Sequence, residues 1–315
     1  MKCGWAILLA VVVTFILTIL ITLILAWLFF SFYLKILERR AMNNYNQIVA
    51  QTCESASLIP YVGPVVVPTL RTRYEVSLAL PLMQVCANVG ISNCPNIGIL
   101  PPPPPFTNFQ QLQGPNPSGG AIHNFGYIFW NTNTAMFVFT GTFFFDEWQD
   151  DFNTKQVAPT TLNNYAPGVL VHGGFYGVYS VVRPALVAWY NANPGPANTL
   201  IITGHSLGGA VATICGYDFA LVNSRIVTYT FAAPRSGNSL YADIYNDNLP
   251  NALRVNNTED IIPALPPSTW QDQTYEHVGN NVPFTVALSS LAENHNDAYL
   301  NYLPTCFPNS APCPL

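Results

Sequence analysis

The stretch that decides the fold runs from Thr199 to Ile214 and reads TLIITGHSLGGAVATI. Its first part is typical of a buried strand and its last part of a helix. Between them lies Ser206, flanked at two-residue spacing by Gly204 and Gly208. A strand that turns sharply into a helix leaves no room for side chains at the flanking positions, so glycine is needed there. The pattern predicts a nucleophile elbow that exposes the Ser206 hydroxyl at a helix N-terminus, beside the amide of Leu207.

The length and charge of the chain limit what else it can be. The 315 residues suffice for one large α/β domain with additions. A net charge of -5 provides no basic patch, so nucleic acid is not an expected partner. Charged residues make up only 9% of the chain, against a typical quarter, and part of this deficit lies at the N-terminus.

The N-terminal run from Cys3 to Leu34 contains no Asp, Glu, Lys, Arg or His. A helix needs about 20 apolar residues to cross a bilayer. The run is longer than the apolar part of a cleaved signal peptide, and no small-x-small cleavage site closes it before Lys35. The sequence therefore predicts a single-pass membrane protein, retained by an anchor over residues 5–34. Basic residues lie on both sides of the anchor, so the positive-inside rule does not decide its orientation.

The seven cysteines include two close pairs in loop-like sequence, Cys86 with Cys94 and Cys306 with Cys313. Such pairs predict disulfides and an oxidising compartment, which places the folded domain on the luminal or extracellular side. Neither pair has the spacing of a zinc site, and Cys215 falls in the predicted helix behind the elbow, as a core residue. No metal or cofactor is predicted.

Three regions are expected along the chain. Residues 1–40 form the anchor and its basic flank, 41–120 a helical region and proline-rich loop that packs on the core, and 121–315 the core domain that contains the elbow. Within the second region a proline interrupts the apolar run Leu78–Leu82, and the sequence from Pro101 through Gly120 is expected to be an extended loop.

Strand and helix patterns alternate in the third region. A hairpin is predicted from Tyr127–Trp130 and Ala135–Phe139, a helix over Phe175–Tyr190, and further strands over Arg225–Phe231 and Ala252–Val255. This order indicates an α/β fold with a mostly parallel central sheet flanked by helices, preceded by the transmembrane helix.

A serine nucleophile needs a histidine base that a carboxylate orients, and behind this kind of elbow the chain order is Ser, then Asp or Glu, then His. Asp260 is the first choice for the acid because it follows a predicted strand, at the sheet edge where α/β sites are built. Glu259 and Asp243 are the alternatives. Two histidines follow, His277 and His295, and the residues alone leave that choice open.

An oxyanion hole needs a second donor besides the Leu207 amide, from the loop after an earlier strand. Thr142 follows the predicted strand that ends at Phe139 and has both an amide and a hydroxyl to offer. The alternative is an ordinary turn at the end of that strand.

From about Phe125 to Tyr299 several motifs, in order, resemble the class 3 (fungal-type) triacylglycerol lipase family, a group of α/β hydrolases. They are Val138-Phe139-Thr140-Gly141-Thr142 with Trp148 and Asp151, Val171-His172-Gly173-Gly174-Phe175, Thr203 to Gly209, Thr230 to Asn238, Arg254-Val255-Asn256 with Asp260-Ile261-Ile262-Pro263 and Leu265-Pro266-Pro267, His277-Val278-Gly279, and His295 with Tyr299.

The resemblance implies a role for each matching residue. They are Ser206 as nucleophile, Asp260 as acid, His295 as base, Thr142 and Leu207 as oxyanion donors, and Gly204, His205 and Gly208 as the elbow. It assigns His277 to a non-catalytic segment. Two positions depart from the family pattern, Thr140 where arginine is usual and Ala232 where glycine is usual.

The resemblance also implies a lid that opens at a lipid surface, over Phe143, Phe144, Phe145 and Trp148, although these aromatic residues are equally expected to be core. A membrane-anchored esterase acting on lipid esters is thus expected. Mono-, di- and triacylglycerols and the sn-1 ester of phospholipids all remain open as substrates. The alternatives are another carboxylesterase activity or a catalytically idle, membrane-tethered binding protein on the same scaffold. The sequence identifies no protein partner.

Overall fold

The computed structural model describes Thr18, Thr22 and residues 53–65, 74–115, 122–141, 155–270 and 272–303. The chain divides into two compact units, Met1–Glu54 and Ser55–Leu315. In the first unit the Thr22 hydroxyl donates to the carbonyl of Thr18 at 2.8 Å. The predictions that fall outside the described residues are the rest of the anchor at 5–34, Thr142, the lid residues Phe143, Phe144, Phe145 and Trp148, and Cys306 with Cys313.

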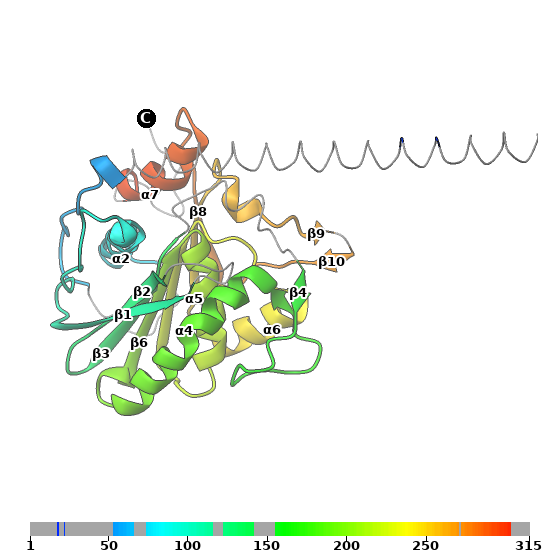
Figure 1. Ribbon diagram of the computed structural model, residues 1–315, viewed down its shortest axis with the longest axis horizontal. Helices are drawn as coiled ribbons and strands as arrows, with labels where there is room; N and C mark the ends of the chain where they lie inside the picture. Colours follow the sequence, from blue (N-terminus) through cyan, green and yellow to red (C-terminus); the bar gives the residue numbers. More distant parts are fainter. Residues whose placement is uncertain are drawn as a thin grey trace, which may run out of the picture. The chain divides into compact units, whose positions relative to one another are not determined.

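A seven-stranded sheet forms the centre of the second unit, in the order β1-β2-β3-β6-β7-β8-β11 (Figure 1). Its strands are β1 (Asn108–Pro115), β2 (Ile122–Trp130), β3 (Thr134–Phe139), β6 (Thr199–His205), β7 (Ile226–Phe231), β8 (Leu253–Asn257) and β11 (Asn280–Phe284). The pairs β1/β2 and β2/β3 are antiparallel, and every pair from β3 to β11 is parallel. The predicted hairpin and mostly parallel sheet are confirmed.

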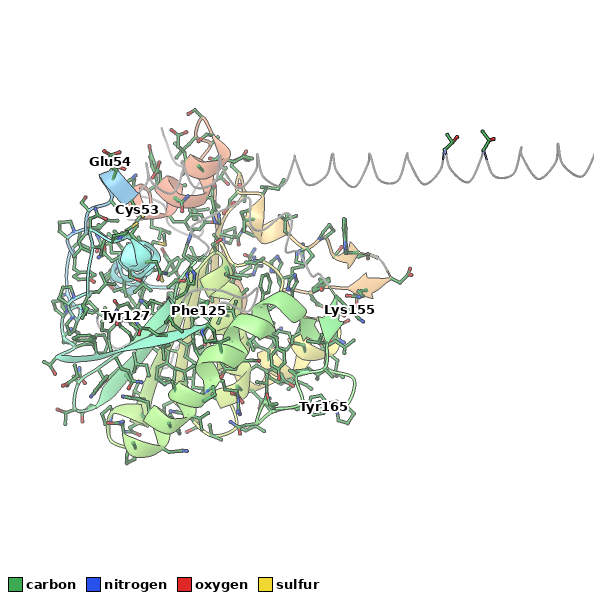
Figure 2. The ribbon with its side chains drawn as sticks, in the orientation of Figure 1. Cys53, Glu54, Phe125, Tyr127, Lys155 and Tyr165 are labelled. Atoms are coloured by element: carbon green, nitrogen blue, oxygen red, sulfur yellow. The ribbon has the colours of Figure 1, made fainter. Side chains whose placement is uncertain are left out.

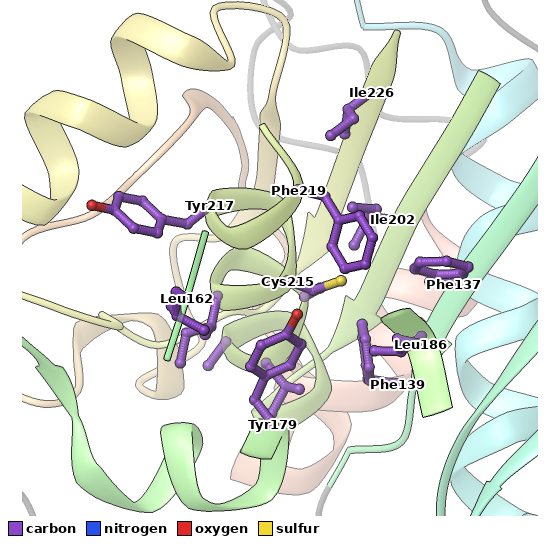
Figure 3. Close-up of a cluster of buried hydrophobic side chains, with 14 of the residues drawn as sticks. Phe137, Phe139, Leu162, Tyr179, Leu186, Ile202, Cys215, Tyr217, Phe219 and Ile226 are labelled. Atoms are coloured by element: carbon purple, nitrogen blue, oxygen red, sulfur yellow. The ribbon is translucent and has the colours of Figure 1, made fainter. Parts of the chain in front are cut away.

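Helices cover both faces of the sheet. On one face lie α4 (Gly173–Ala192), α5 (Leu207–Phe219) and α6 (Ser239–Asn248), and on the other α2 (Val76–Gly90) and the short α7 (Ala298–Asn301) (Figure 1). Successive side chains of a strand point to opposite faces of the sheet, so they pack against different helix layers. Phe137 and Ile202 therefore pack with Cys215 of α5 (Figure 3), a free buried cysteine as predicted, whereas Met136 and Ile201 pack toward α2.

The first strand corrects an expectation. The sequence predicts an extended loop that includes Asn108–Pro115, but this segment is the edge strand β1, paired antiparallel with β2. Its burial alternates weakly and its side chains are mostly polar, as is common for an edge strand, which has a neighbouring strand on one side only. One of these, Gln111, donates its amide to the hydroxyl of Tyr127 at 2.8 Å. Tyr127 lies in the neighbouring strand β2 (Figure 2).

The second correction concerns α2, which runs through Pro81 without interruption. With the following turn η1 (Ile91–Asn93) it forms the one helix, among the described residues, that is long and apolar enough to cross a membrane. More than half of this helix is buried inside the protein, since it packs on β3 and β6. It is a core helix, and the anchor predicted at 5–34 stays a prediction.

The third correction concerns the cysteine pairing. Cys86 is a free, buried thiol, whereas Cys94 and Cys53 are both in disulfides, so the predicted pair Cys86/Cys94 is wrong. Cys86 lies on the inner face of α2, where its Sγ is 3.5 Å from the Thr203 hydroxyl of β6. Burial raises the pKa of this thiol to about 12. Proximity in sequence did not decide the pairing because α2 turns Cys86 toward the sheet.

Candidate active site

A single residue, Ser206, connects β6 to α5, with φ of 58° and ψ of -127°. This left-handed conformation is strained for any residue other than glycine. A Cβ atom on Gly204 would lie 2.2 Å from the Gly208 carbonyl carbon, and one on Gly208 would lie 2.3 Å from the carbonyl oxygen of Phe139. Both glycines are therefore required by close backbone approach. The Ser206 amide donates to the carbonyl of Phe231 at 2.9 Å, which ties the turn to β7.

Leu207 is the first residue of α5, so its amide belongs to the positive end of the helix. The end of β3 also reaches the elbow, because a Cβ atom on Gly141 would lie 3.5 Å from the Cβ of Ser206. Thr142 comes next in the sequence but lies outside the described residues, and its role as a donor stays a prediction.

The acid and base candidates meet at the carboxyl edge of the sheet. Nδ1 of His295 lies 2.8 Å from Oδ2 of Asp260. The same oxygen accepts a hydrogen bond from the Tyr299 hydroxyl at 3.0 Å, and Oδ1 accepts one from the Ile262 amide at 3.0 Å. The Asp260 side chain is 1% exposed and that of His295 is 12% exposed, so the pair is shielded but the imidazole is still reachable.

The other candidates lie elsewhere. His277 is held by the Pro263 carbonyl, and burial together with the charges of Arg254 and Arg235 lowers its pKa to about 3. Glu259 and Asp243 are exposed to solvent. Of the alternatives that the residues left open, the structure brings together only Asp260 and His295.

His205 connects the elbow to the turn that carries His295. Its Nε2 lies 2.7 Å from the His295 carbonyl oxygen, and the two ring centroids are 4.6 Å apart. Burial and the neighbouring His295 lower the pKa of His205 well below its usual value, so the neutral ring donates through Nε2–H. His295 itself lies in η4 (Glu293–Asp297), a π-helical turn, an element often found at functional sites.

Asn257 is a residue that sequence reasoning missed. Its side-chain amide donates to the carbonyls of Val286 and Asn294 at 2.8 and 3.2 Å, which joins the end of β8 to the segment before His295. Its backbone amide donates at 2.8 Å to the Tyr299 hydroxyl, which in turn donates to Asp260. No local pattern marks this residue, because its partners lie far away in the sequence.

The sheet order, the strained serine after a central parallel strand, and the acid and histidine that follow β8 and β11 define an α/β hydrolase. Residues 136–270 of the chain match the family described as Lipase (class 3).

Three similar proteins have related descriptions. A lipase of Rhizomucor miehei is 33% identical over 147 residues, 44% of this chain and 39% of that protein. Secreted mono- and diacylglycerol lipase 1 of Fusarium solani is 33% identical over 102 residues, 32% of this chain and 31% of that protein. Phospholipase A(1) DAD1, chloroplastic, of Arabidopsis thaliana is 27% identical over 128 residues, 37% of this chain and 29% of that protein. The chain thus spans 39% or less of each relative's length.

Proposed function

We propose that the protein is a membrane-anchored serine esterase that hydrolyses the carboxylic ester bonds of acylglycerols through an acyl-enzyme on Ser206. One observation carries the proposal: the bonded pair Asp260–His295 is held to the elbow by His205, the residue next to the strained serine. Acyl transfer needs a serine nucleophile and a histidine whose Nδ1 is bound to a buried carboxylate, and the elbow and the Asp260–His295 pair supply both.

In the proposed mechanism His295 takes the proton of the Ser206 hydroxyl through Nε2 as Oγ attacks the ester carbonyl. The resulting oxyanion is held by the amides of Leu207 and Thr142. When the tetrahedral intermediate collapses, the C–O bond to the alcohol breaks and the alcohol oxygen takes the proton from His295. Water then repeats the two steps on the acyl-enzyme and releases the free acid.

The substrate class rests on the relatives. Their names, a lipase, a mono- and diacylglycerol lipase and a phospholipase A(1), share an ester between a fatty acid and glycerol. The aromatic residues Phe143, Phe144, Phe145 and Trp148 are proposed as a lid and suit such acyl chains. The phospholipase relative makes an sn-1 phospholipid ester the second candidate.

The location is also a proposal. The charge-free residues 5–34 are proposed to hold the enzyme at the membrane that contains its substrate. The disulfide-bonded Cys53 and Cys94 support a luminal or extracellular position for the hydrolase domain, because disulfides persist in oxidising compartments.

The test uses the full chain in detergent micelles and a fluorophosphonate probe, which reacts with an activated serine. Wild type should be labelled and should hydrolyse a short-chain nitrophenyl ester. Ser206→Ala should lose labelling and at least about 10³-fold in kcat. Ser180→Ala, an exposed serine on α4, is the matched control and should behave as wild type. Folded wild-type protein that is neither labelled nor active would establish the idle-scaffold alternative instead.

Substrate preference is then measured with mono-, di- and triacylglycerol and with phosphatidylcholine in mixed micelles, by release of free fatty acid. Higher kcat/KM on acylglycerols supports the proposal. Higher kcat/KM on phosphatidylcholine, with release from the sn-1 position, would replace it with a phospholipase A1 activity.

A further inference from the structure

Arg235 binds three consecutive carbonyl groups of one loop. Its Nη1 donates to the carbonyls of Ala264 and Pro266, the second at 2.6 Å, and its backbone amide donates to the carbonyl of Leu265 at 2.8 Å. In the described part of the chain the ion pairs join Arg183 to Asp218 and His295 to Asp260. The Arg235 guanidinium is thus held by carbonyl oxygens and not by a carboxylate among these residues.

The loop that Arg235 holds leads directly back to the candidate acid. It contains the 3₁₀ turn η3 (Ile262–Ala264), closed by a bond of 2.9 Å from the Ala264 amide to the Ile261 carbonyl. The amide of Ile262, the first residue of that turn, donates to Oδ1 of Asp260 at 3.0 Å. Hydrogen bonds and the short backbone stretch 261–264 therefore connect Arg235 to the carboxylate.

The segment that carries Arg235 also supports the nucleophile elbow. It begins at Phe231, whose carbonyl accepts the Ser206 amide. Farther along, a Cβ atom on Gly209 in the first turn of α5 would lie 2.8 Å from the Cβ of Ala233. The Thr213 hydroxyl of α5 donates to the Ser236 hydroxyl at 2.8 Å. The segment 231–236 thus contacts the element after the nucleophile on one side and the loop after the acid on the other.

We infer that Arg235 is a positioning residue for the proposed triad, which sets the distance between the acid loop at Asp260 and the elbow at Ser206. The inference rests on the proposed function. Arg235 touches none of the reacting atoms; it acts through the turn at Ile262, whose amide orients the carboxylate. A carboxylate displaced by about 1 Å no longer holds the histidine in its reactive orientation, and such displacements cost on the order of 100-fold in rate.

Arginine suits this role because its planar guanidinium stays charged and directs its N–H groups in fixed directions. Burial lowers the pKa of Arg235 from its usual value, and the carbonyl dipoles around it offset part of the cost of burying the charge. A methionine side chain has a similar aliphatic part but no hydrogen-bond donor. A lysine side chain keeps the positive charge but is shorter than that of arginine. The two substitutions therefore separate the role of the donors from that of the packed stem.

The experiment compares Arg235→Met, Arg235→Lys and the matched control Arg183→Met in the full chain, with kcat expressed per fluorophosphonate-titrated site. Arg183 pairs with Asp218 at the far end of α5. At 1.5 Å per residue this pair lies about 18 Å from the elbow. Loss of Arg183 should therefore destabilise the protein without disturbing the acid loop. Hydrogen exchange of peptides that cover 260–266 gives a readout independent of activity.

We expect Arg235→Met to lower kcat by about 10- to 100-fold, with KM within about 3-fold, and to speed exchange in 260–266. Arg235→Lys should recover part of the kcat, and it is the variant to use where Arg235→Met does not fold. Arg183→Met should lower the melting temperature with kcat unchanged. Unchanged kcat in both Arg235 variants, or an equal loss of kcat in Arg183→Met, would overturn the inference.

Failure of the proposed function is distinct from failure of this inference. The first appears in the wild type, as folded protein without labelling or ester hydrolysis. The second appears only in the variants, as a wild-type kcat without Arg235.

Discussion

Nδ1 of His295 and Oδ2 of Asp260 lie 2.8 Å apart although 35 residues separate them in the chain. The sheet register explains the proximity. Strands β8 and β11 are parallel neighbours, paired from Leu253 with Asn280 to Asn257 with Phe284, so the segments that follow them emerge at the same edge. The acid follows the first strand within three residues and the histidine follows the second through the loop to η4.

Replacing Asp260 by Asn should abolish most of the activity. The amide keeps the size of the carboxylate but cannot stabilise the imidazolium or hold the correct tautomer, and the expected loss in kcat is on the order of 10⁴-fold. Steady-state kinetics on a soluble ester measure it. Asp243→Asn, on the exposed side of α6, is the control and should keep wild-type kcat; an Asp260→Asn enzyme with near wild-type kcat would remove Asp260 from the triad.

Tyr299→Phe should lower stability more than activity. The hydroxyl accepts the buried Asn257 amide and donates to Asp260, and its loss leaves that amide without a partner. We expect the free energy of unfolding to fall by about 1–3 kcal/mol. The matched control is Tyr190→Phe, which loses only an exposed bond to the Val222 carbonyl. Thermal unfolding measures the stability of both variants. Equal losses of stability in Tyr299→Phe and Tyr190→Phe would contradict this account.

His277 should make the protein less stable in acid. Burial and the nearby Arg254 and Arg235 lower its pKa from 6.5 to about 3. Between these values the unfolded chain binds the proton and the folded chain does not, so the free energy of unfolding falls as the pH drops through this window. In His277→Gln the free energy of unfolding should fall less steeply between pH 6.5 and pH 4. The slope should be smaller by up to about 1.4 kcal/mol per pH unit.

His172 provides an independent comparison for this prediction, since burial alone lowers its pKa to about 4. Substituting it by Gln should remove a separate part of the pH dependence, and the double variant should lose both parts. Denaturation curves at several pH values measure the slopes. A slope that does not change in His277→Gln is incompatible with a neutral buried imidazole at that position.

Ala232 carries measurable backbone strain. It has φ of 52°, in the left-handed region that favours glycine, at a buried position. Ala232→Gly deletes a buried methyl group but relieves about 1–2 kcal/mol of strain, so its free energy of unfolding should change by less than about 1 kcal/mol. Ala233→Gly deletes a buried methyl group without this relief and should be the more destabilising by about 1–2 kcal/mol. Equal effects of the two substitutions would show that Ala232 is not strained.

Local patterns predicted much of the fold. The elements found where the sequence predicts them are the hairpin around 131–133, the helix α4 and the strands β6, β7 and β8. Their apolar residues follow one regular pattern, either a continuous buried run or a regular alternation along the element. Strand β1 was missed since an edge strand of glutamines has no such alternation. The Cys86 pairing was wrong because the side of α2 on which a cysteine lies depends on what the helix packs against.

The sequence by itself determined the elbow: a serine between two glycines, after a strand and before a helix, has one low-energy turn because steric exclusion acts between residues close in the chain. It could narrow the base to His277 or His295, and family resemblance was needed to choose between them. Only the tertiary structure decided that His295 reaches Asp260, that Asn257 and His205 hold the histidine segment, and that Arg235 holds the acid loop. These contacts join residues that are far apart in sequence, and their partners are set by strand register and helix packing, which no local pattern encodes.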